Sequence, residues 1–538
     1  MDEHSLSSAL ASFLTRRSAA PVEVGSIRQL AGGASCRVYS FEARQHGRAP
    51  RTLVLRLDAD GGAVRSDRRE EFVLLAAAAR SGVTVPAVHW CGDATEGLGG
   101  AFFVMDLVTG EAIARRLLRD ERYAQTRAVL PRQLAREAAR IHDVDLTAPS
   151  LAFLRAREPS GQDPRRYAMA EIDKYRQILA AFSCDHPYPL LQLTARWLEQ
   201  NAPGVLRPAL VHGDYRVGNV MFDERGLTAV LDWELAHVGD AVEDLGWLCV
   251  RTWRFGNDDL AAGGLCSREE LLAHYREEGG ADVEPSHLLF WELFGNWKWA
   301  IICRMQAERH KGGKHPDVEL AAIGRRLAET EDEILNLLGV GSGLASEHLA
   351  EATTGDTQAR TAGAASAEIG DTQVRTAGAA SAKPGGTPAA TAAAPLAIAA
   401  TPSGILDEPS AIELLEALGA FLKHELAGRL EGSAHFKALV GANVAGIVAR
   451  EIALRPHHAA AQAQRLASLL QHDVEPHQPR DHDPMARELS FALCRRIEAG
   501  HADAGPWREQ VLAHLRATVD EKLAIDNPAR LGGSRQRP

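Results

Sequence analysis

One short block of the sequence combines residue types that could bind a divalent metal ion and orient a reacting hydroxyl group. In chain order these residues are His212, Asp214, Asn219 and Asp232. Carboxylate and amide oxygens are ligands that Mg²⁺ prefers in proteins. Transfer of a phosphoryl group needs a metal ion to neutralise developing charge and a carboxylate to orient the attacking hydroxyl. The block is therefore a candidate centre for phosphoryl transfer, although a single Asp at a turn is more often only a cap.

The residues between Asn219 and Asp232 predict how these side chains come together. Two short apolar runs, 220–222 and 227–231, flank a cluster of turn-forming residues, which is typical of a β-hairpin. If the turn is centred near Arg225-Gly226, Asn219 and Asp232 lie opposite each other at the open end of the hairpin. The His-Gly-Asp segment then lies on the loop that leads into it.

The block resembles the catalytic loop of the aminoglycoside phosphotransferase and choline kinase superfamily, in which His-Gly-Asp is followed by Asn and then by a metal-binding Asp. The resemblance implies that Asp214 is the catalytic base and that Asn219 and Asp232 bind Mg²⁺. It also implies that His212 braces the loop. ATP and Mg²⁺ are then the cofactors, and the fold is α+β, protein-kinase-like and two-lobed. The resemblance covers about residues 20–340.

The same resemblance assigns nucleotide-binding roles upstream. Gly32, Gly33 and Ser35 lie where a glycine-containing turn would cover the phosphates, although such a turn alone is more often a simple hairpin connection. Arg56 lies on a predicted strand, where a cation would contact the α- and β-phosphates. The commonest pattern has Lys at this position. Arg keeps the charge and binds phosphate bidentately, so nucleotide binding is expected more firmly than full turnover.

Two further upstream roles follow from the resemblance. Glu71 is expected to pair with Arg56, and Glu70 is the alternative partner. The competing interpretation is that both Glu residues lie on an exposed helical face. The segment that includes Met105 and Leu107 is expected to join the two lobes and to hydrogen-bond the adenine through its backbone. A buried strand is compatible with that role.

The elements that position these residues can be read from the sequence pattern. Runs rich in β-forming residues predict strands, and one run has helical character; these are the strands 26–30, 37–41, 52–57 and 101–107 and the helix 68–80. From Gly110 onward the pattern is mostly helical, interrupted by turns and strands at 210–233. We therefore predict a β-rich lobe over 1–107 and a helical lobe over 108–342.

The last part of the chain is predicted to be a linker followed by a separate unit. Residues 343–403 are dominated by Ala, Thr, Gly and Ser and contain one duplicated low-complexity unit, which predicts a flexible linker. Residues 404–530 show helical spacing of apolar residues and predict an all-α bundle of four or five helices. We expect this bundle to be an interaction or regulatory module, and its scattered histidines to be solvated loop residues.

Two segments after the block carry competing interpretations. Asp240 and Glu243 fit a helix capping box, which we favour over a catalytic role. Asp244 is expected to brace the catalytic loop. The helical segment 290–310 mixes Trp with cations such as Lys298, and it is either an acceptor-binding surface or, as we favour, a core helix with an exposed basic edge.

The acceptor can be inferred only from a finer resemblance. The sequence of residues 231–240 resembles that of one branch of phosphotransferase domains, whose members are fused to, or encoded beside, acyl-CoA dehydrogenases. It implies a hydroxylated acyl-CoA or related carboxylated metabolite as the small-molecule acceptor, and an enzyme of acyl-CoA metabolism as a partner. An aminoglycoside acceptor would instead call for a strongly acidic pocket. The C-terminal unit resembles an uncharacterised helical family that accompanies such phosphotransferases.

Composition excludes several other classes of protein. The 538 residues carry a net charge of -11, which argues against a nucleic-acid groove. The seven cysteines form no CxxC pair, so we expect no thiol chemistry. We expect the protein to reside in a reducing compartment. The N-terminus lacks the features of a signal peptide, and no apolar run is long enough to span a membrane. These features predict a cytoplasmic protein without membrane contact.

Two classes of function stay open on the sequence alone. The first is an active small-molecule kinase. The second is a nucleotide-binding scaffold without turnover, in which the helical unit recruits a partner. The presence of Asp214, Asn219 and Asp232 together favours chemistry, whereas Arg56 favours the scaffold. A Ser/Thr protein kinase is disfavoured because the His-Arg-Asp and Asp-Phe-Gly motifs are missing.

Overall fold

The computed structural model describes residues 2–18, 20–30, 36–58, 67–205, 207–312, 317–340, 409–471 and 482–533. The turn residues Gly32, Gly33 and Ser35 lie outside the described residues, as does the linker predicted over 343–403.

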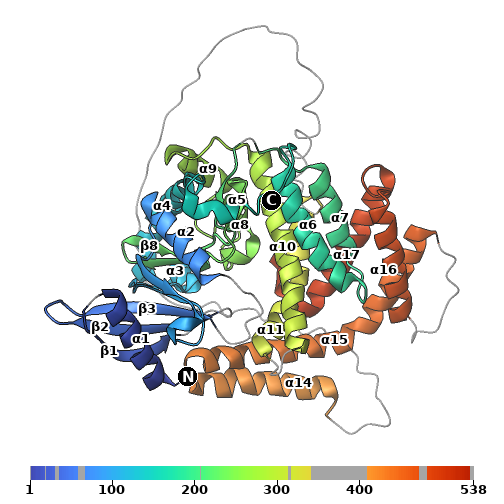
Figure 1. Cartoon of the computed structure of the whole chain (residues 1–538). Coiled ribbons are helices and arrows are strands. Elements are labelled where there is room, and N and C mark those ends of the chain that lie inside the picture. Colours follow the sequence, from blue (N-terminus) through green and yellow to red (C-terminus); the bar gives the residue numbers. More distant parts are fainter. Residues whose placement is uncertain are drawn as a thin grey trace, which may run out of the picture.

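A five-stranded antiparallel sheet forms the first lobe, with the strand order β1-β2-β3-β5-β4 (Figure 1). Its strands are β1 (Val22–Leu30), β2 (Cys36–Gln45), β3 (Arg51–Asp58), β4 (Val88–Gly92) and β5 (Phe102–Asp106). The sequence patterns predicted four of these strands but not β4. All five residues of β4 are only partly buried, so the strand lacks the alternation that makes a strand recognisable.

One helix packs on each face of this sheet. Helix α1 (Glu3–Ser18) buries a stripe of apolar side chains against the face that carries Leu53 and Leu55 of β3. Helix α2 (Arg68–Arg80) packs on the opposite face, against Val54 and Phe103. The sequence pattern predicts a single helix in this lobe, and this prediction is wrong. Because side chains alternate along β3, Arg56 faces α2 together with Val54.

The second lobe is mostly helical and contains two small strand pairs. Its helices are α3 (Ala114–Arg119), α4 (Ala124–His142), α5 (Ala152–Arg155), α6 (Arg166–Ser183), α7 (Pro189–Gln200), α8 (Val242–Cys249), α9 (Arg268–Glu277), α10 (Pro285–Gly312), α11 (Val318–Gly324) and α12 (Leu327–Leu337). The strands pair as β6 (Ala209–Val211) with β9 (His237–Gly239) and as β7 (Val220–Asp223) with β8 (Gly226–Val230). The predicted combination of a β-rich lobe and a larger helical lobe is confirmed.

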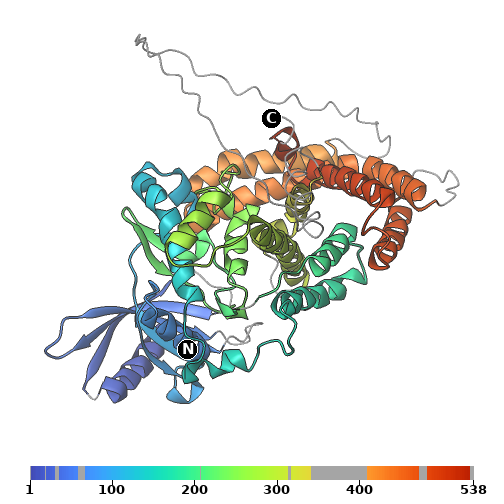
Figure 2. The ribbon, with the colours of Figure 1, turned by 90° about the horizontal axis from the view of Figure 1, so that it is seen from above.

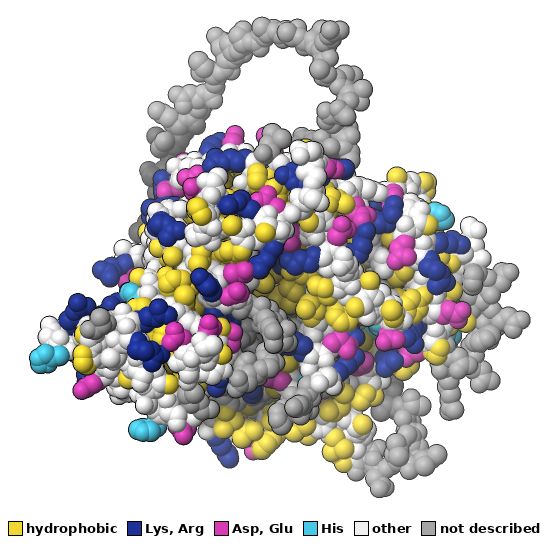
Figure 3. Space-filling model, in the orientation of Figure 1, with side chains coloured by type: hydrophobic (Ala, Val, Ile, Leu, Met, Phe, Trp, Pro, Cys, Tyr) yellow, Lys and Arg dark blue, Asp and Glu magenta, His cyan; other side chains and the backbone are white. Residues whose placement is uncertain are grey.

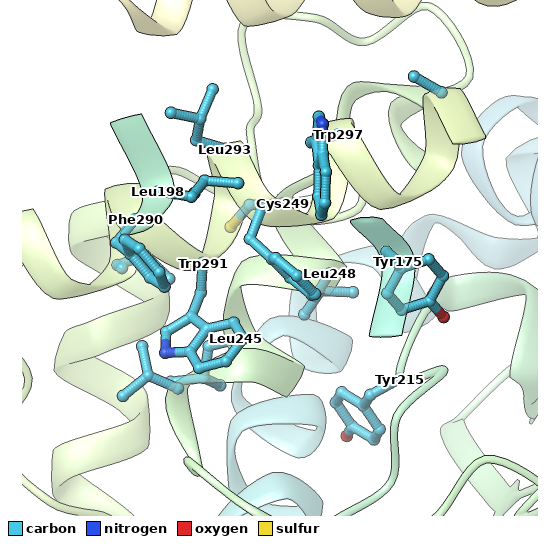
Figure 4. Close-up of a cluster of buried hydrophobic side chains, with 14 of the residues drawn as sticks. Tyr175, Leu198, Tyr215, Leu245, Leu248, Cys249, Phe290, Trp291, Leu293 and Trp297 are labelled. Carbon is cyan, nitrogen blue, oxygen red and sulfur yellow. The ribbon is translucent and has the colours of Figure 1, made fainter. Parts of the chain in front are cut away.

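The core of the helical lobe is centred on α8 and α10. Trp291 and Trp297 of α10 are fully buried and lie in one cluster with Leu245 and Leu248 of α8 (Figure 4). The two helices approach closely at Gly246, where a Cβ atom would lie only 2.5 Å from the Trp291 backbone. This contact fixes α8, which carries two of the polar residues that reach the candidate site.

The C-terminal unit is all-α, as predicted, and packs against the helical lobe (Figures 1 and 2). It consists of α14 (Ala411–Ala420), α15 (Gly432–Leu470), α16 (His482–Glu498), α17 (Pro506–Asp526) and α18 (Ala529–Gly533). The apolar periodicities at 436–448 and 459–470 belong to one 39-residue helix that continues through Pro456. Ion pairs such as Arg196–Asp503 and Lys522–Glu331 join the two units.

The surface is mixed in charge. Figure 3 shows acidic and basic side chains interspersed over the described part of one face. Several large apolar side chains are exposed on α14, on the π-helical segment that follows it (Phe421–Leu426) and on α15, namely Leu414, Leu418, Phe421, Phe436 and Ile452. No helix among the described residues is both long and apolar enough to cross a bilayer.

Candidate active site

The predicted hairpin forms and brings Asn219 and Asp232 to its open end. Asp223 pairs with Gly226, so the turn consists of Glu224 and Arg225, one residue earlier than predicted. At the open end, the amide of Leu231 donates to the carbonyl oxygen of Asn219 over 2.8 Å. Asp232 follows immediately and has a φ of 68°, a left-handed conformation that Asp tolerates better than most residues.

Asp214 is held by three side chains. Its Oδ2 accepts a hydrogen bond from Nδ2 of Asn219 over 2.5 Å, and its Oδ1 accepts from Nε1 of Trp247 over 2.7 Å. Arg216 donates to the same Oδ1 over 3.0 Å. Since Asn219 Nδ2 also donates to the Asp214 carbonyl oxygen, the amide oxygen of Asn219 is left for another partner. The carboxylate is therefore oriented before any substrate arrives.

His212 and Asp244 brace the loop from inside the lobe. Asp244 accepts hydrogen bonds from the amides of His212, over 2.7 Å, and of Gly213, over 2.9 Å. His212 is fully buried, and its Nε2 donates to the carbonyl oxygen of Leu231 over 3.0 Å. Burial would raise the pKa of Asp244, but hydrogen bonds from His142 and the loop amide lower it. Asp244 thus stays charged and fixes the loop.

Arg56 lies between the two lobes. Its Nη1 is 3.1 Å from Oε1 of Glu71, and its Nη2 is 3.5 Å from Oδ1 of Asp232. Glu70, the alternative partner, instead forms a bidentate ion pair with Arg157. Burial would lower the pKa of Arg56, but Glu71 and Asp232 raise it, so the guanidinium stays charged. The structure therefore brings a cation of the sheet to the predicted metal-binding carboxylate.

The predicted nucleotide-binding segment lies at the junction of the lobes. Met105 is buried on β5, and Leu107 follows the strand with a half-exposed side chain. The Leu107 amide donates to the carbonyl oxygen of Thr52 on β3 over 3.4 Å. This arrangement is compatible with the expected backbone contact to adenine, which stays a prediction.

Lys298 is a further residue of the candidate site. It is only 2 % exposed, whereas we had expected a basic edge in contact with solvent. Its Nζ donates to the carbonyl oxygen of Gly213 over 3.1 Å and lies 3.5 Å from Glu243. The ammonium group also lies 4.6 Å from the Trp247 ring centroid. The only signal in the sequence was a Lys among the buried aromatic positions of one helix, because its contacts Gly213 and Glu243 lie on other elements.

A compact charged cluster adjoins Lys298. Glu171, His237 and Glu243 place one ligand atom each within 4.8 Å of one another, a spacing that could hold a metal ion. Burial would lower the pKa of His237, but Glu243 and Glu171 raise it to about 9. The imidazole is therefore protonated at neutral pH and, together with the Lys298 ammonium group, balances the charges of the two carboxylates.

The capping box expected at the start of α8 is wrong. Asp240 accepts a hydrogen bond from the Val242 amide over 3.1 Å, but its other oxygen accepts from His287 and from Nε1 of Trp291. The Glu243 side chain turns away from the helix start and lies 3.2 Å from His237. Side chains from other elements compete successfully for both carboxylates, which a local sequence pattern cannot reveal.

Comparison with known proteins identifies the two units. The family model described as "Phosphotransferase enzyme family" matches residues 26–280, a range that contains Arg56, the loop at 212–219 and Asp232. Residues 26–280 are thus similar to this phosphotransferase family. The phosphotransferase domain is followed by a second match, over residues 428–530, to a domain of unknown function (DUF6285).

Curated relatives of the phosphotransferase domain are named acyl-CoA dehydrogenase family members. The chain is 30 % identical over 348 residues to family member 11 of Gallus gallus, covering 59 % of this chain and 42 % of that protein. It is 28 % identical over 241 residues to family member 10 of Mus musculus, covering 42 % of this chain and 22 % of that protein. The chain thus spans less than half of these relatives.

Among solved structures, a candidate aminoglycoside phosphotransferase of Ralstonia eutropha is 24 % identical, with a TM-score of 0.48. The match covers 60 % of this chain and 95 % of that one.

Proposed function

We propose that this chain is an ATP-dependent small-molecule kinase that phosphorylates a hydroxyl group. The observation that carries the proposal is the placement of Asp214, Asn219 and Asp232 at one end of the hairpin, facing Arg56 across the lobes. A carboxylate that is oriented in advance, next to oxygen ligands and a phosphate-binding cation, suits phosphoryl transfer.

The donor set fits Mg²⁺ and nucleotide. The amide oxygen of Asn219 and the carboxylate of Asp232 would hold the metal ion, which neutralises charge on the transferred phosphoryl group when it is bound. Arg56 would contact the phosphates, and the backbone near Met105 and Leu107 would receive the adenine. Gly32, Gly33 and Ser35 keep their predicted role over the phosphates.

Asp214 would act on the acceptor. Its carboxylate orients the attacking hydroxyl and takes up the hydroxyl proton as the new oxygen–phosphorus bond forms and the bond to the leaving diphosphate breaks. The hydrogen bonds from Trp247 and Arg216 occupy Oδ1, so the proton is expected to reach Oδ2, the oxygen that faces Asn219.

The acceptor that we propose is a hydroxylated acyl-CoA or a related carboxylated metabolite. Two observations support this acceptor. Residues 231–240 resemble phosphotransferase domains associated with acyl-CoA dehydrogenases, and the curated relatives are named acyl-CoA dehydrogenase family members. The charged cluster of Glu171, His237, Glu243 and Lys298 contains both signs, unlike the strongly acidic pocket that a polycationic aminoglycoside would need.

A mass-spectrometric screen tests the proposal. The full chain is incubated with Mg-ATP and a panel of hydroxyacyl-CoA thioesters, hydroxy acids and sugars, and products heavier by one phosphoryl group are sought. Asp214→Asn serves as the inactive reference. Transfer by the wild type alone supports a kinase. Stabilisation of both proteins by Mg-ATP without transfer to any acceptor supports the alternative, a nucleotide-binding scaffold whose helical unit recruits a partner.

A further inference from the structure

A cavity of about 560 Å³ lies where the helical lobe meets the C-terminal helices. One wall comes from His186, Leu190 at the start of α7, and Glu331 of α12, and the other wall comes from α15, α16 and α17. Its lining includes no residue of the loop 212–219 or of the sheet. The volume is in the usual range for small-molecule sites. The cavity is therefore a separate candidate site, independent of the proposed kinase activity.

The lining combines apolar and cationic surface. Leu190, Leu515 and Val519 are buried and form the apolar part. Arg487 and Lys522 bring cationic groups from α16 and α17. Pockets that hold small organic molecules combine an apolar lining with a few placed polar groups, and Arg is well suited to carboxylate and phosphate. The composition suits an organic anion with an apolar body.

The cationic side chains of the wall are not all neutralised. Lys522 is paired with Glu331, and Arg455 is paired with Asp483. Arg487, by contrast, donates to a backbone carbonyl on the loop before α7 and, among the residues that the structure describes, forms no ion pair with a carboxylate. Arg487 therefore contributes a charge that an anionic ligand can neutralise.

The pKa values of two histidines in the lining reflect burial and the positive charge around them. Burial, followed by the charges of Lys522, Arg304 and Arg487, lowers the pKa of His186 to about 4. His514 is 5 % exposed, and burial lowers its pKa to about 4 as well. Within the described residues, the buried Nδ1 of His514 has no hydrogen-bond partner. A neutral imidazole can complete that bond with a ligand oxygen.

We propose that this cavity binds a small organic anion, with its carboxylate or phosphate at Arg487 and its apolar body against Leu190, Leu515 and Val519. Because the walls come from both units, such a ligand stabilises the docked arrangement of the C-terminal helices on the phosphotransferase domain. The concentration of the ligand thus sets the fraction of molecules in which the helical unit is docked.

Calorimetry on the full chain with octanoate, octyl phosphate and octanol tests this proposal. Octanoate and octyl phosphate represent the two anion chemistries, and octanol is the uncharged control. At least one of the two anions is expected to bind with saturation, and octanol is expected to bind at least tenfold more weakly. Arg487→Gln removes an exposed charge and is expected to weaken anion binding roughly tenfold. Arg495→Gln, an exposed position further along α16, is the matched control and is expected to leave binding unchanged.

Three outcomes overturn the proposal: saturable binding of neither anion, equal affinities for octanol and the anions, or affinities in Arg487→Gln that equal those of the wild type. A kinase without activity on any acceptor leaves this experiment interpretable, because binding at the cavity is measured without ATP. Conversely, loss of binding here leaves the phosphoryl-transfer assay unaffected.

Discussion

The ammonium group of Lys298 donates a hydrogen bond to the carbonyl oxygen of Gly213, one residue before Asp214. A buried cation on α10 therefore fixes the backbone that carries the proposed base. Tyr175 and Glu243 surround the same ammonium group, and both raise the pKa of Lys298 although burial would lower it. This charge is permanent at neutral pH, so Lys298 acts as a positioning residue for the loop.

Replacement of Lys298 by Met is expected to lower kcat by roughly ten- to a hundredfold, with little change in KM for ATP, because a misplaced base affects the transition state and leaves nucleotide contacts intact. Steady-state kinetics measure both constants. Lys311→Met, an exposed change on the same helix, is the control. A rise in KM for ATP with unchanged kcat would contradict the positioning role.

Replacement of Asp214 by Asn is expected to lower kcat by roughly a hundredfold to ten-thousandfold, because the amide cannot accept the hydroxyl proton. Mg-ATP should still stabilise the variant, since the amide stays isosteric with the carboxylate. Single-turnover kinetics and thermal melting give the two readouts. Asp223→Asn on the neighbouring hairpin is the control. Near-normal turnover in the Asp214 variant would exclude it as the base.

Replacement of Arg56 by Met is expected to weaken ATP binding by roughly tenfold or more, because a charge-assisted contact to phosphate is lost. The change also removes a buried partner of Glu71, although Arg68 still pairs with that carboxylate. Arg56→Lys should recover part of the affinity. Equilibrium binding of ATP measures the effect, and Arg44→Met, half-exposed on the neighbouring strand β2, is the control. Unchanged affinity in Arg56→Met would place the phosphates elsewhere.

Stability is expected to fall as the pH rises through about 9, because His237 is protonated in the folded protein at pH values where it is neutral in the unfolded chain. A pKa that is raised on folding contributes stability below the unfolded value of 6.5, and the contribution is lost above the folded value. The effect is at most about 3 kcal/mol. Denaturant unfolding from pH 6 to 10 measures it, and His237→Gln should flatten this part of the profile. An equally steep profile in the variant would assign the loss to other groups.

The sequence predicted the lobes, the hairpin and the spacing of Asp214, Asn219 and Asp232, because these depend on local turn chemistry and on a few adjacent residue types. It could not predict that Lys298 contacts Gly213 and Glu243, since these residues lie on other elements, far from Lys298 in the chain. Helix α1 was missed although Leu6, Leu10 and Phe13 recur at helical spacing, so this helix was predictable from the sequence.

Calorimetric titration of ATP into the wild type and into Asp232→Asn, each with and without Mg²⁺, decides whether Asp232 binds the metal ion. We expect that Mg²⁺ raises the affinity of the wild type for ATP by at least about tenfold, and that this gain disappears in Asp232→Asn. An equal gain from Mg²⁺ in both proteins would contradict the claim that Asp232 helps to hold the metal ion beside Asp214 and Asn219.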